Sequence, residues 1–234
     1  MCGRFTLTQN PAELIKAVGA EPVKEIPPRY NIAPGQMITV ILREAEYIRP
    51  IVQGLIWGFI PFWAKELDKY GHPVNARAES AAEKPMFRAS MRHHRCIIPA
   101  DGFFEWQKVV GIKIPHYIYM KNKKIFGMAG LWDRYEGKDG SIMDTCLILT
   151  TGANPLVKKL HDRMPVILKS EDYVKWLDPQ LQDANTVMKM IAPEDAARMQ
   201  MHEVSRIVNA TTTNSEECIK PVGHETPPQQ ELPF

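Results

Sequence analysis

The sequence predicts an α+β fold, with one domain built on a mainly antiparallel β-sheet or barrel and with helices at its periphery. Short apolar runs such as RCIIP, FFEWQ, PHYIYM and TCLILT follow one another, separated by turns rich in Gly, Asn, Asp and Lys. This spacing favours an antiparallel sheet over alternating βαβ units. Segments with helical signals precede and follow these runs, so we expect helices around the sheet.

The first ninety residues should contain two helical segments with strands between them. In NPAELIKAVG, Asn10 is a suitable N-cap, Pro11 fits the first helical position, and a glycine ends the segment. Residues 37–60 are rich in β-branched and aromatic side chains and predict strands of a meander. Residues 79–92 predict a helix that is interrupted at Pro85.

The C-terminal third predicts short helices and then a tail. The segments ANPLVKKL, SEDYVKWL and PEDAARMQM have helical composition. Only the end, GHETPPQQELPF, changes composition sharply, which is typical of a flexible tail. We therefore expect one domain over residues 1–222 and a tail over residues 223–234.

Composition narrows the class of protein. The 234 residues are 44% hydrophobic with a net charge of +2, as in soluble globular proteins. A charge this small neither demands nor excludes nucleic acid as a partner. No signal peptide or stretch of about 18 apolar residues is present. The four cysteines are widely separated and form no CxxC pair, so we expect a reducing cytoplasmic location and no zinc, disulfide or cofactor.

The opening residues MCGRF contain the most unusual cysteine. If Met1 is removed, Cys2 carries a free α-amine and a thiol on adjacent carbons. Their ordinary pKa values, about 7.7–8.0 for the amine and about 8.5 for the thiol, leave both partly deprotonated near neutrality. With an aldehyde, the amine forms an imine and the thiol then closes a five-membered thiazolidine ring. Cys2 is thus a candidate for covalent capture of aldehydes.

Two other interpretations of Cys2 stay open on the residues alone. The thiolate, with its own α-amine as base, could attack an amide as in an N-terminal-nucleophile amidohydrolase or amidotransferase. Cys2 could also be a small structural residue of a first strand, in a protein that binds DNA without catalysis.

Three further stretches carry polar side chains suited to chemistry. VNARAES contains Asn75, a neutral hydrogen-bonding group, and Arg77, a potential anion clamp. In ADGFFEWQ, aromatic neighbours of Glu105 should desolvate its carboxylate and raise its pKa toward the range of general acid–base catalysis. LHDRMP offers His161 as a titratable group and Arg163 as a bidentate anion binder. Each has a structural alternative, and spacing does not show whether they meet in space.

Seven segments, MCGRF, PRYNIAPG, IWGFIPFW, NARAE, RCIIPADGFFEW, HDRMPVIL and HEVSRIVNATTTNSEECIKPV, together resemble the SOS-response-associated peptidase (SRAP) family, which includes abasic-site DNA–protein crosslinking proteins. They extend from residue 2 to about residue 222. The resemblance implies that Cys2, freed of Met1, captures the aldehyde of an abasic site in single-stranded DNA as a thiazolidine. It implies that Asn75 orients Cys2, Glu105 moves protons, and His161 assists sugar ring opening and Schiff-base formation. It also implies peptidase-like self-processing of the N-terminus and lyase-type chemistry.

Candidate DNA contacts surround these residues. Arg4, Arg77 and Arg163 lie beside the candidate catalytic residues in the sequence and are expected to bind phosphates. Trp63 and Trp106 are expected to stack on bases, a contact that tolerates any base sequence.

The last residues, QQELPF, resemble the peptide with which bacterial replication proteins dock on the sliding clamp. Gln229, Leu232 and Phe234 occupy the anchor positions of that motif, after a proline-rich tether. Such a peptide places apolar anchor residues in a preformed pocket of the partner, and a flexible linker joins it to its own domain. The resemblance implies the replication sliding clamp as a further partner.

Overall fold

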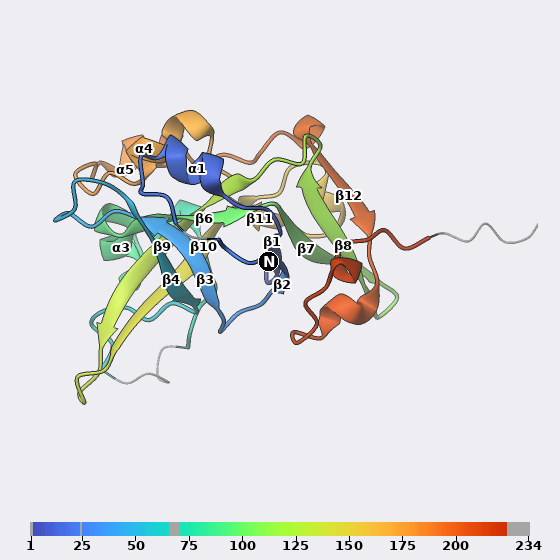
Figure 1. Cartoon of the computed structure of the whole chain (residues 1–234), viewed down its shortest axis with the longest axis horizontal. Helices are drawn as coiled ribbons and strands as arrows, with labels where there is room; N and C mark the ends of the chain where they lie inside the picture. The colour runs from blue at the N-terminus through green and yellow to red at the C-terminus, as the bar shows by residue number, and fades with distance from the viewer. Residues whose placement is uncertain (1, 24, 66–70, 224–234) are drawn as a thin grey trace, which may run out of the picture.

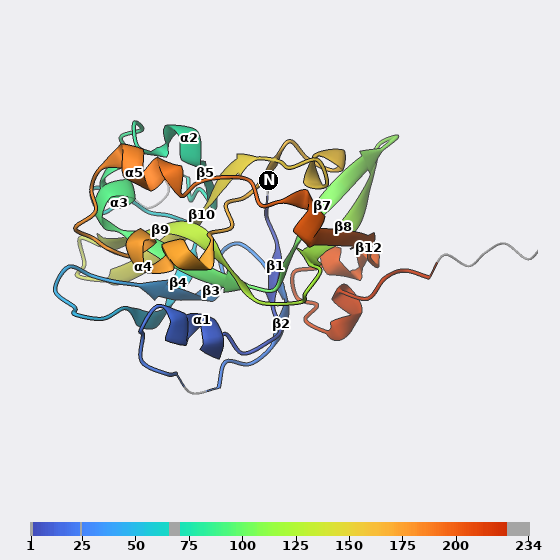
Figure 2. The ribbon, with the colours of Figure 1, turned by 90° about the horizontal axis from the view of Figure 1, so that it is seen from above.

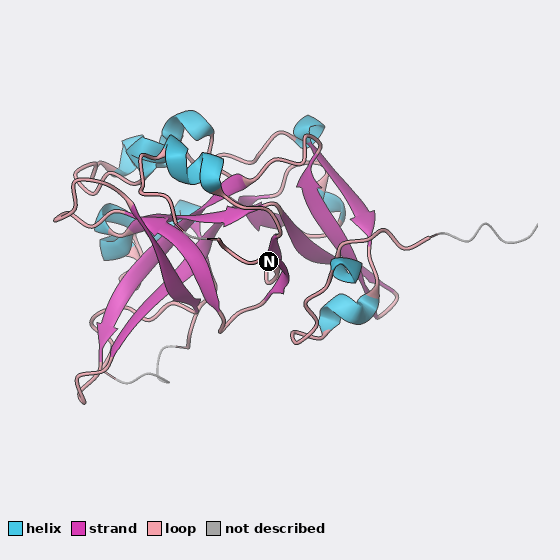
Figure 3. Ribbon diagram, in the orientation of Figure 1, coloured by secondary structure: helices cyan, strands magenta, loops and turns pink. Residues whose placement is uncertain are grey.

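Two β-sheets form the centre of the molecule, and short helices surround them (Figures 1 and 3). The fold is seen in a computed structural model that describes residues 2–23, 25–65 and 71–223. The arrangement confirms the predicted α+β class, with one domain and a mainly antiparallel core. None of the helices in the described part of the chain is long and apolar enough to cross a membrane.

The larger sheet closes into a small barrel. Its five closing strands are β3 (Met37–Leu42), β4 (Ile51–Trp57), β6 (Arg95–Ala100), β9 (Phe126–Glu136) and β10 (Ile142–Gly152). The ring runs from β10 to β4, β3, β6 and β9 and back to β10, with one parallel pairing, between β10 and β4. Their inward side chains form the core, which includes Trp57, Ile98 and Met128.

Two short strands gather at the end of β10. Strand β5 (Asn75–Arg77) pairs with β10 in parallel from Ile148, and β11 (Arg163–Pro165) pairs with it antiparallel up to Gly152. The segments NAR and RMP, nearly ninety residues apart in the sequence, therefore reach the same edge of the barrel.

The smaller sheet carries the N-terminus. Its strands, in spatial order, are β12 (Met199–Glu203), β8 (Ile112–Met120), β7 (Gly102–Val109), β1 (Phe5–Leu7) and β2 (Arg29–Ile32). Phe5 of β1 lies opposite Phe103 of β7, and the Phe104 amide donates to the Arg4 carbonyl at 3.0 Å. This register places Cys2 beside the strand that carries Glu105.

Asp101 fixes strand β1 in position. Its buried carboxylate accepts hydrogen bonds from the Thr6 hydroxyl, from the Thr8 amide and hydroxyl at 2.6 Å each, and from the Gln9 amide at 3.1 Å. Charged acceptors make strong hydrogen bonds when buried. Strand β1 and the two residues that follow it are therefore tied to Asp101, between β6 and β7.

The helices are short and lie around the barrel (Figure 2). They are α1 (Ala12–Ala17), α2 (Ala78–Ala81), α3 (Arg88–His93), α4 (Tyr173–Trp176) and α5 (Ala184–Lys189), with 3₁₀ turns η2 (Val157–Lys159), η3 (Ser170–Asp172), η4 (Ala196–Arg198), η5 (Arg206–Asn209) and η6 (Glu216–Cys218). The two helices α2 and α3 confirm the predicted interruption near Pro85. In the first segment, the helix begins at Ala12 with Pro11 as its N-cap, one residue later than predicted, and the Asn10 side chain accepts from the Ala12 amide at 3.1 Å.

Two predicted helices were wrong. PEDAARMQM forms a single 3₁₀ turn and then strand β12, whose Met199 and Gln200 lie opposite Met120 and Tyr119 of β8. ANPLVKKL likewise forms only the 3₁₀ turn η2. Pairing with a neighbouring strand outweighs the helical propensity of Ala, Met and Arg here.

Candidate active site

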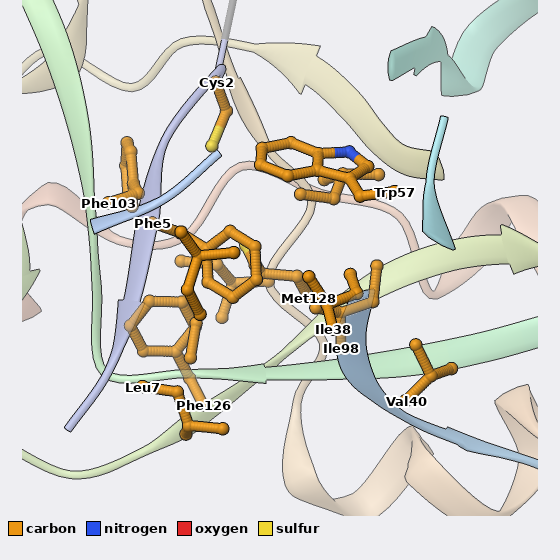
Figure 4. Close-up of a cluster of buried hydrophobic side chains, with 14 of the residues drawn as sticks. Cys2, Phe5, Leu7, Ile38, Val40, Trp57, Ile98, Phe103, Phe126 and Met128 are labelled. Atoms are coloured by element: carbon orange, nitrogen blue, oxygen red, sulfur yellow. The ribbon is translucent and has the colours of Figure 1, made fainter. Parts of the chain in front are cut away.

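Cys2 lies at the top of the buried core. Its side chain is 0% exposed and packs with Trp57 and Phe103, which flank it in Figure 4. The thiol points toward the Arg4 carbonyl, with 3.8 Å between sulfur and oxygen. Burial raises the pKa of the Cys2 thiol far above its ordinary value, and the negative charge of Glu105 adds to this rise. The thiol therefore stays protonated near neutral pH.

Asn75 holds the backbone of Cys2. Its Nδ2 donates a hydrogen bond to the Cys2 carbonyl at 2.8 Å. The Asn75 Oδ1 is buried, and no described residue donates a hydrogen bond to it. A buried acceptor without a donor is unfavourable unless a ligand supplies one. Asn75 thus positions Cys2 and offers an acceptor at the same place.

Glu105 lies near both Cys2 and His161. Glu105, on β7, is only 3% exposed, and burial raises the pKa of its carboxyl while nearby His161 partly opposes the rise. His161 follows η2, and its Nδ1 accepts a hydrogen bond from the Arg163 amide at 2.9 Å. In the neutral imidazole the proton must then reside on Nε2. The carboxyl is held ready to exchange protons at a higher pH than usual.

A pocket of about 480 Å³ opens beside Glu105 and His161. It is lined by Arg4, Glu105, Trp106, Lys108, Lys113, His161 and Asn209. Three cationic side chains, those of Arg4, Lys108 and Lys113, thus line the same pocket as Glu105. The structure brings together all four residues that the sequence singled out as catalytic: Cys2, Asn75, Glu105 and His161.

Arg4 has several partners within the protein. Its guanidinium donates to the Asn31 side chain at 2.8 Å. It also donates to the carbonyls of Val208 at 2.6 Å and Asn209 at 3.1 Å, and it lies 6.0 Å from the centre of the Trp106 ring. These bonds join the N-terminal segment to η5, so much of the donor capacity of Arg4 is used in the fold.

The other two predicted arginines differ from each other. Arg163 makes a bidentate ion pair with Glu79, at 2.9 and 2.7 Å, and also donates to the Thr150 carbonyl at 2.5 Å. Arg77, two residues after Asn75 on β5, is exposed. Of the three predicted phosphate ligands, only Arg77 therefore has its side chain directed to solvent.

The two predicted stacking residues have different settings. Trp106 lines the pocket, and its Nε1 donates to the Asn209 side chain at 2.8 Å. Trp63 is 37% exposed beside the more exposed Phe62 and does not line the pocket. The structure therefore places only Trp106 at the site entrance.

The sequence reasoning missed three lining residues: Lys108, Lys113 and Asn209. The two lysines had a local signal, because KVVGIK places them symmetrically about a glycine turn. Asn209 had no local signal in the sequence, since its contact with Trp106 joins residues 103 positions apart.

The fold and site together define a class of protein: a small mixed β-barrel whose second residue is a buried cysteine facing a carboxylate–histidine pair. Residues 1–211 match the family described as SOS response associated peptidase (SRAP), and the chain belongs to that family.

Relatives and solved structures agree with this assignment. The chain is 40% identical over 225 residues to "Abasic site processing protein YoqW" of Bacillus subtilis, a match that covers 94% of this chain and 99% of that protein. It is 28% identical to "Abasic site processing protein HMCES" of Xenopus tropicalis, over 94% of this chain and 78% of the relative. The crystal structure of a Bacteroides thetaiotaomicron protein superposes with a TM-score of 0.82 at 28% identity, over 94% of this chain and 99% of that one.

Proposed function

We propose that this protein recognises abasic sites in single-stranded DNA and crosslinks to them through Cys2 once Met1 has been removed. The observation that carries the proposal is that Glu105, the charged neighbour of Cys2, lines a pocket together with His161 and three cationic side chains. Relatives that span nearly the whole chain are named for processing abasic sites. The crosslink would shield the lesion during the response to DNA damage.

The chemistry needs an aldehyde and both functional groups of Cys2. The α-amine attacks C1′ of the ring-opened deoxyribose, and loss of one water gives an imine. The sulfur then adds to the imine carbon, its proton passes to the nitrogen, and a thiazolidine forms. Because sulfur and imine belong to the same residue, ring closure is intramolecular and strongly favoured.

The neighbouring residues have distinct roles in this proposal. Asn75 fixes the Cys2 backbone through the 2.8 Å hydrogen bond and offers Oδ1 to the incoming group. Glu105, with its raised pKa, accepts and returns protons during imine formation. His161, with its Nε2 proton, donates to the sugar oxygen as the ring opens.

The state of the thiol argues against the amidohydrolase alternative. An amidohydrolase needs a thiolate as its first nucleophile, and in this structure, with Met1 in place, burial raises the pKa of the Cys2 thiol above its ordinary value. In the crosslink the amine attacks first, and the thiol is needed only after the imine has formed. A protonated thiol is compatible with this order.

The proposal also covers two further activities, the DNA contacts, the location and the functional domain. The peptidase-like activity would be removal of the protein's own Met1, and the lyase-type activity would be the Schiff-base chemistry at C1′. Arg4 and Trp106, which line the pocket, are the proposed contacts to phosphate and base there, with Trp63, Arg77 and Arg163 as contacts outside it. We propose the cytoplasm, in association with the nucleoid, as the location, and residues 1–222 as the functional domain.

A denaturing gel tests the proposal. Protein with Cys2 at its N-terminus is mixed with an oligonucleotide that carries a single abasic site, and a covalent band of retarded mobility should appear. The same oligonucleotide with an intact base should give no such band. If the abasic oligonucleotide also gives none, the proposed function is wrong.

Asn75→Ala should slow crosslinking about tenfold, because loss of a hydrogen bond of about 1–1.5 kcal/mol would leave Cys2 free to shift. Rates at saturating DNA measure this. Thr145→Val is the matched control: it removes a buried hydroxyl that accepts from the Ile60 amide at 2.9 Å, away from the pocket. Its crosslinking rate should equal the wild-type rate. Equal rates for both variants would contradict the role of Asn75.

The C-terminal peptide gives a separate proposal about partners. Gln229, Leu232 and Phe234 lie outside the described residues, and the proposal rests on the motif QQELPF alone. Deletion of residues 229–234 should abolish capture of the purified sliding clamp at micromolar concentration and leave crosslinking of free oligonucleotides unchanged. Undiminished clamp capture by the truncated protein would end the idea.

A further inference from the structure

The outer half of the β7–β8 hairpin extends beyond the rest of the sheet (Figure 2). Strand β7 pairs with β1 only at Gly102 and Phe103, and β8 pairs with β12 only from His116 onward. From Gln107 to Ile114 the two strands pair only with each other, while the Pro115 carbonyl also accepts a hydrogen bond from the Val204 amide at 3.0 Å. A two-stranded ribbon of this kind is marginally stable by itself. An unfavourable cross-strand pair in it therefore calls for an explanation.

One of those pairs is unfavourable in the free protein. Lys108 and Lys113 lie directly opposite each other, on the same face of the ribbon. Like charges directly opposite on neighbouring strands destabilise a hairpin. An anion held between the two ammonium groups would turn this repulsion into attraction.

The two lysines face the site. Both line the pocket that contains Glu105 and His161, together with Trp106 of the same ribbon. Within the described ranges, neither lysine forms an ion pair. Arg4 and Arg163, by contrast, already donate to protein acceptors. The lysine pair is thus the cationic group of the pocket that is available to a ligand.

The distance along β7 indicates what the pair would bind. Lys108 is three residues from Glu105, about 10 Å along a strand at ~3.3 Å per residue; their side chains leave opposite faces of β7, and both line the same pocket. A nucleotide whose sugar reaches Glu105 would therefore have a neighbouring backbone phosphate near the lysines. Trp106, on the same face as Lys108 and between it and the site, offers a ring to the base between them.

We propose that Lys108 and Lys113 together clasp one phosphodiester of the single strand that leaves the pocket. The inference rests on the proposed function in one respect only, that a single-stranded nucleic acid enters this pocket. It adds a defined exit path for the strand along the β7–β8 ribbon. Neither lysine takes part in the covalent chemistry.

Binding without crosslinking tests the clasp. The probe is a fluorescent single-stranded oligonucleotide with one tetrahydrofuran abasic analogue, which has no aldehyde. The variant is Lys108→Gln with Lys113→Gln. Its matched control is Lys121→Gln with Lys123→Gln, which removes the same charge from exposed positions at the turn after β8, away from the pocket.

We expect the hairpin variant to bind roughly fivefold more weakly by fluorescence anisotropy, as for two solvent-accessible charge contacts. The slope of log K against log salt concentration should become shallower by about 0.7, the value for one phosphate of a single strand. The control should match the wild-type protein in both respects. A hairpin variant indistinguishable from the control would overturn the clasp.

A scan with single methylphosphonate linkages locates the phosphate. One uncharged linkage beside the analogue should weaken binding of the wild-type protein and have no effect on the hairpin variant. If no linkage distinguishes the two proteins, the clasp is wrong.

Thermal unfolding shows whether the variant is folded, and its midpoint should not fall, since like-charge repulsion has been removed. Absence of a crosslink to a natural abasic site would overturn the proposed function instead, and anisotropy would still test the clasp.

Discussion

Cys2→Ala should abolish the heat-stable crosslink, because alanine keeps the α-amine and lacks the sulfur that closes the ring. We expect the yield on a denaturing gel to fall at least ~100-fold, since no other group can convert the imine into a thiazolidine. Alanine is also small enough for Met1 to be removed. An undiminished yield of stable adduct would show that the thiazolidine chemistry is wrong.

Borohydride separates the amine from the thiol in this experiment. Reduction traps an imine as a secondary amine, so Cys2→Ala should form a stable adduct when borohydride is present. A form with extra residues before Cys2 has no α-amine at Cys2 and should form no adduct at Cys2, with or without the reductant. Cys218→Ala is the matched control, since Cys218 is equally buried and donates only to the Thr213 carbonyl. It should crosslink like the wild-type protein.

Glu105→Gln should give the second largest effect, a fall of about 100-fold in the crosslinking rate, in line with the loss of a general acid–base group. Glutamine keeps the shape of the side chain and cannot exchange protons. Single-turnover gel kinetics at saturating DNA measure the rate. Glu194→Gln is the matched control, because Glu194 is a buried carboxylate that pairs with Arg198 outside the pocket. Its rate should stay at the wild-type value.

The pH dependence of the same rate reports on Glu105 directly. Burial raises the pKa of Glu105, so its carboxylate is lost at a higher pH than the ordinary carboxyl value of about 4.3. Its action as a base is present above the raised pKa and disappears as the pH falls through it. The α-amine must also be deprotonated, which alone gives a log rate slope of about one below its pKa.

The wild-type profile should therefore steepen from a slope of about one to about two once the pH falls below the pKa of Glu105, while the Glu105→Gln profile keeps a slope of about one. Identical profiles would remove Glu105 from proton transfer.

Much of the fold could be predicted from the sequence, because the strands of the barrel carry their own signals. The apolar runs that become β6 to β10 are bounded by turn residues and rich in β-branched and aromatic side chains. Strand β12 carried no such signal. Its sequence favours a helix, and only the five residue pairs with β8 make it a strand.

The polar residues of the site were accessible to prediction for a different reason. Cys2 is unusual because of its position alone, and the aromatic neighbours of Glu105 predict a desolvated carboxylate. The sequence could not show that Arg163 is paired with Glu79 or that Arg4 bonds to η5, since these contacts join residues 84 or more positions apart. The two lysines of the ribbon could not be predicted as part of the site. Lysines are common near turns, and only the strand register places these two opposite each other.

The covalent state of Cys2 in the purified crosslink tests the central claim most directly. The adduct with an abasic oligonucleotide is denatured, treated with iodoacetamide, digested and analysed by tandem mass spectrometry. We expect the DNA remnant on the N-terminal peptide, with a mass equal to the sum of the two parts less one water, and no alkylation of the Cys2 sulfur. A remnant on a lysine, or a Cys2 sulfur that is alkylated in the adduct, would contradict the thiazolidine and with it the proposed role of the N-terminal cysteine.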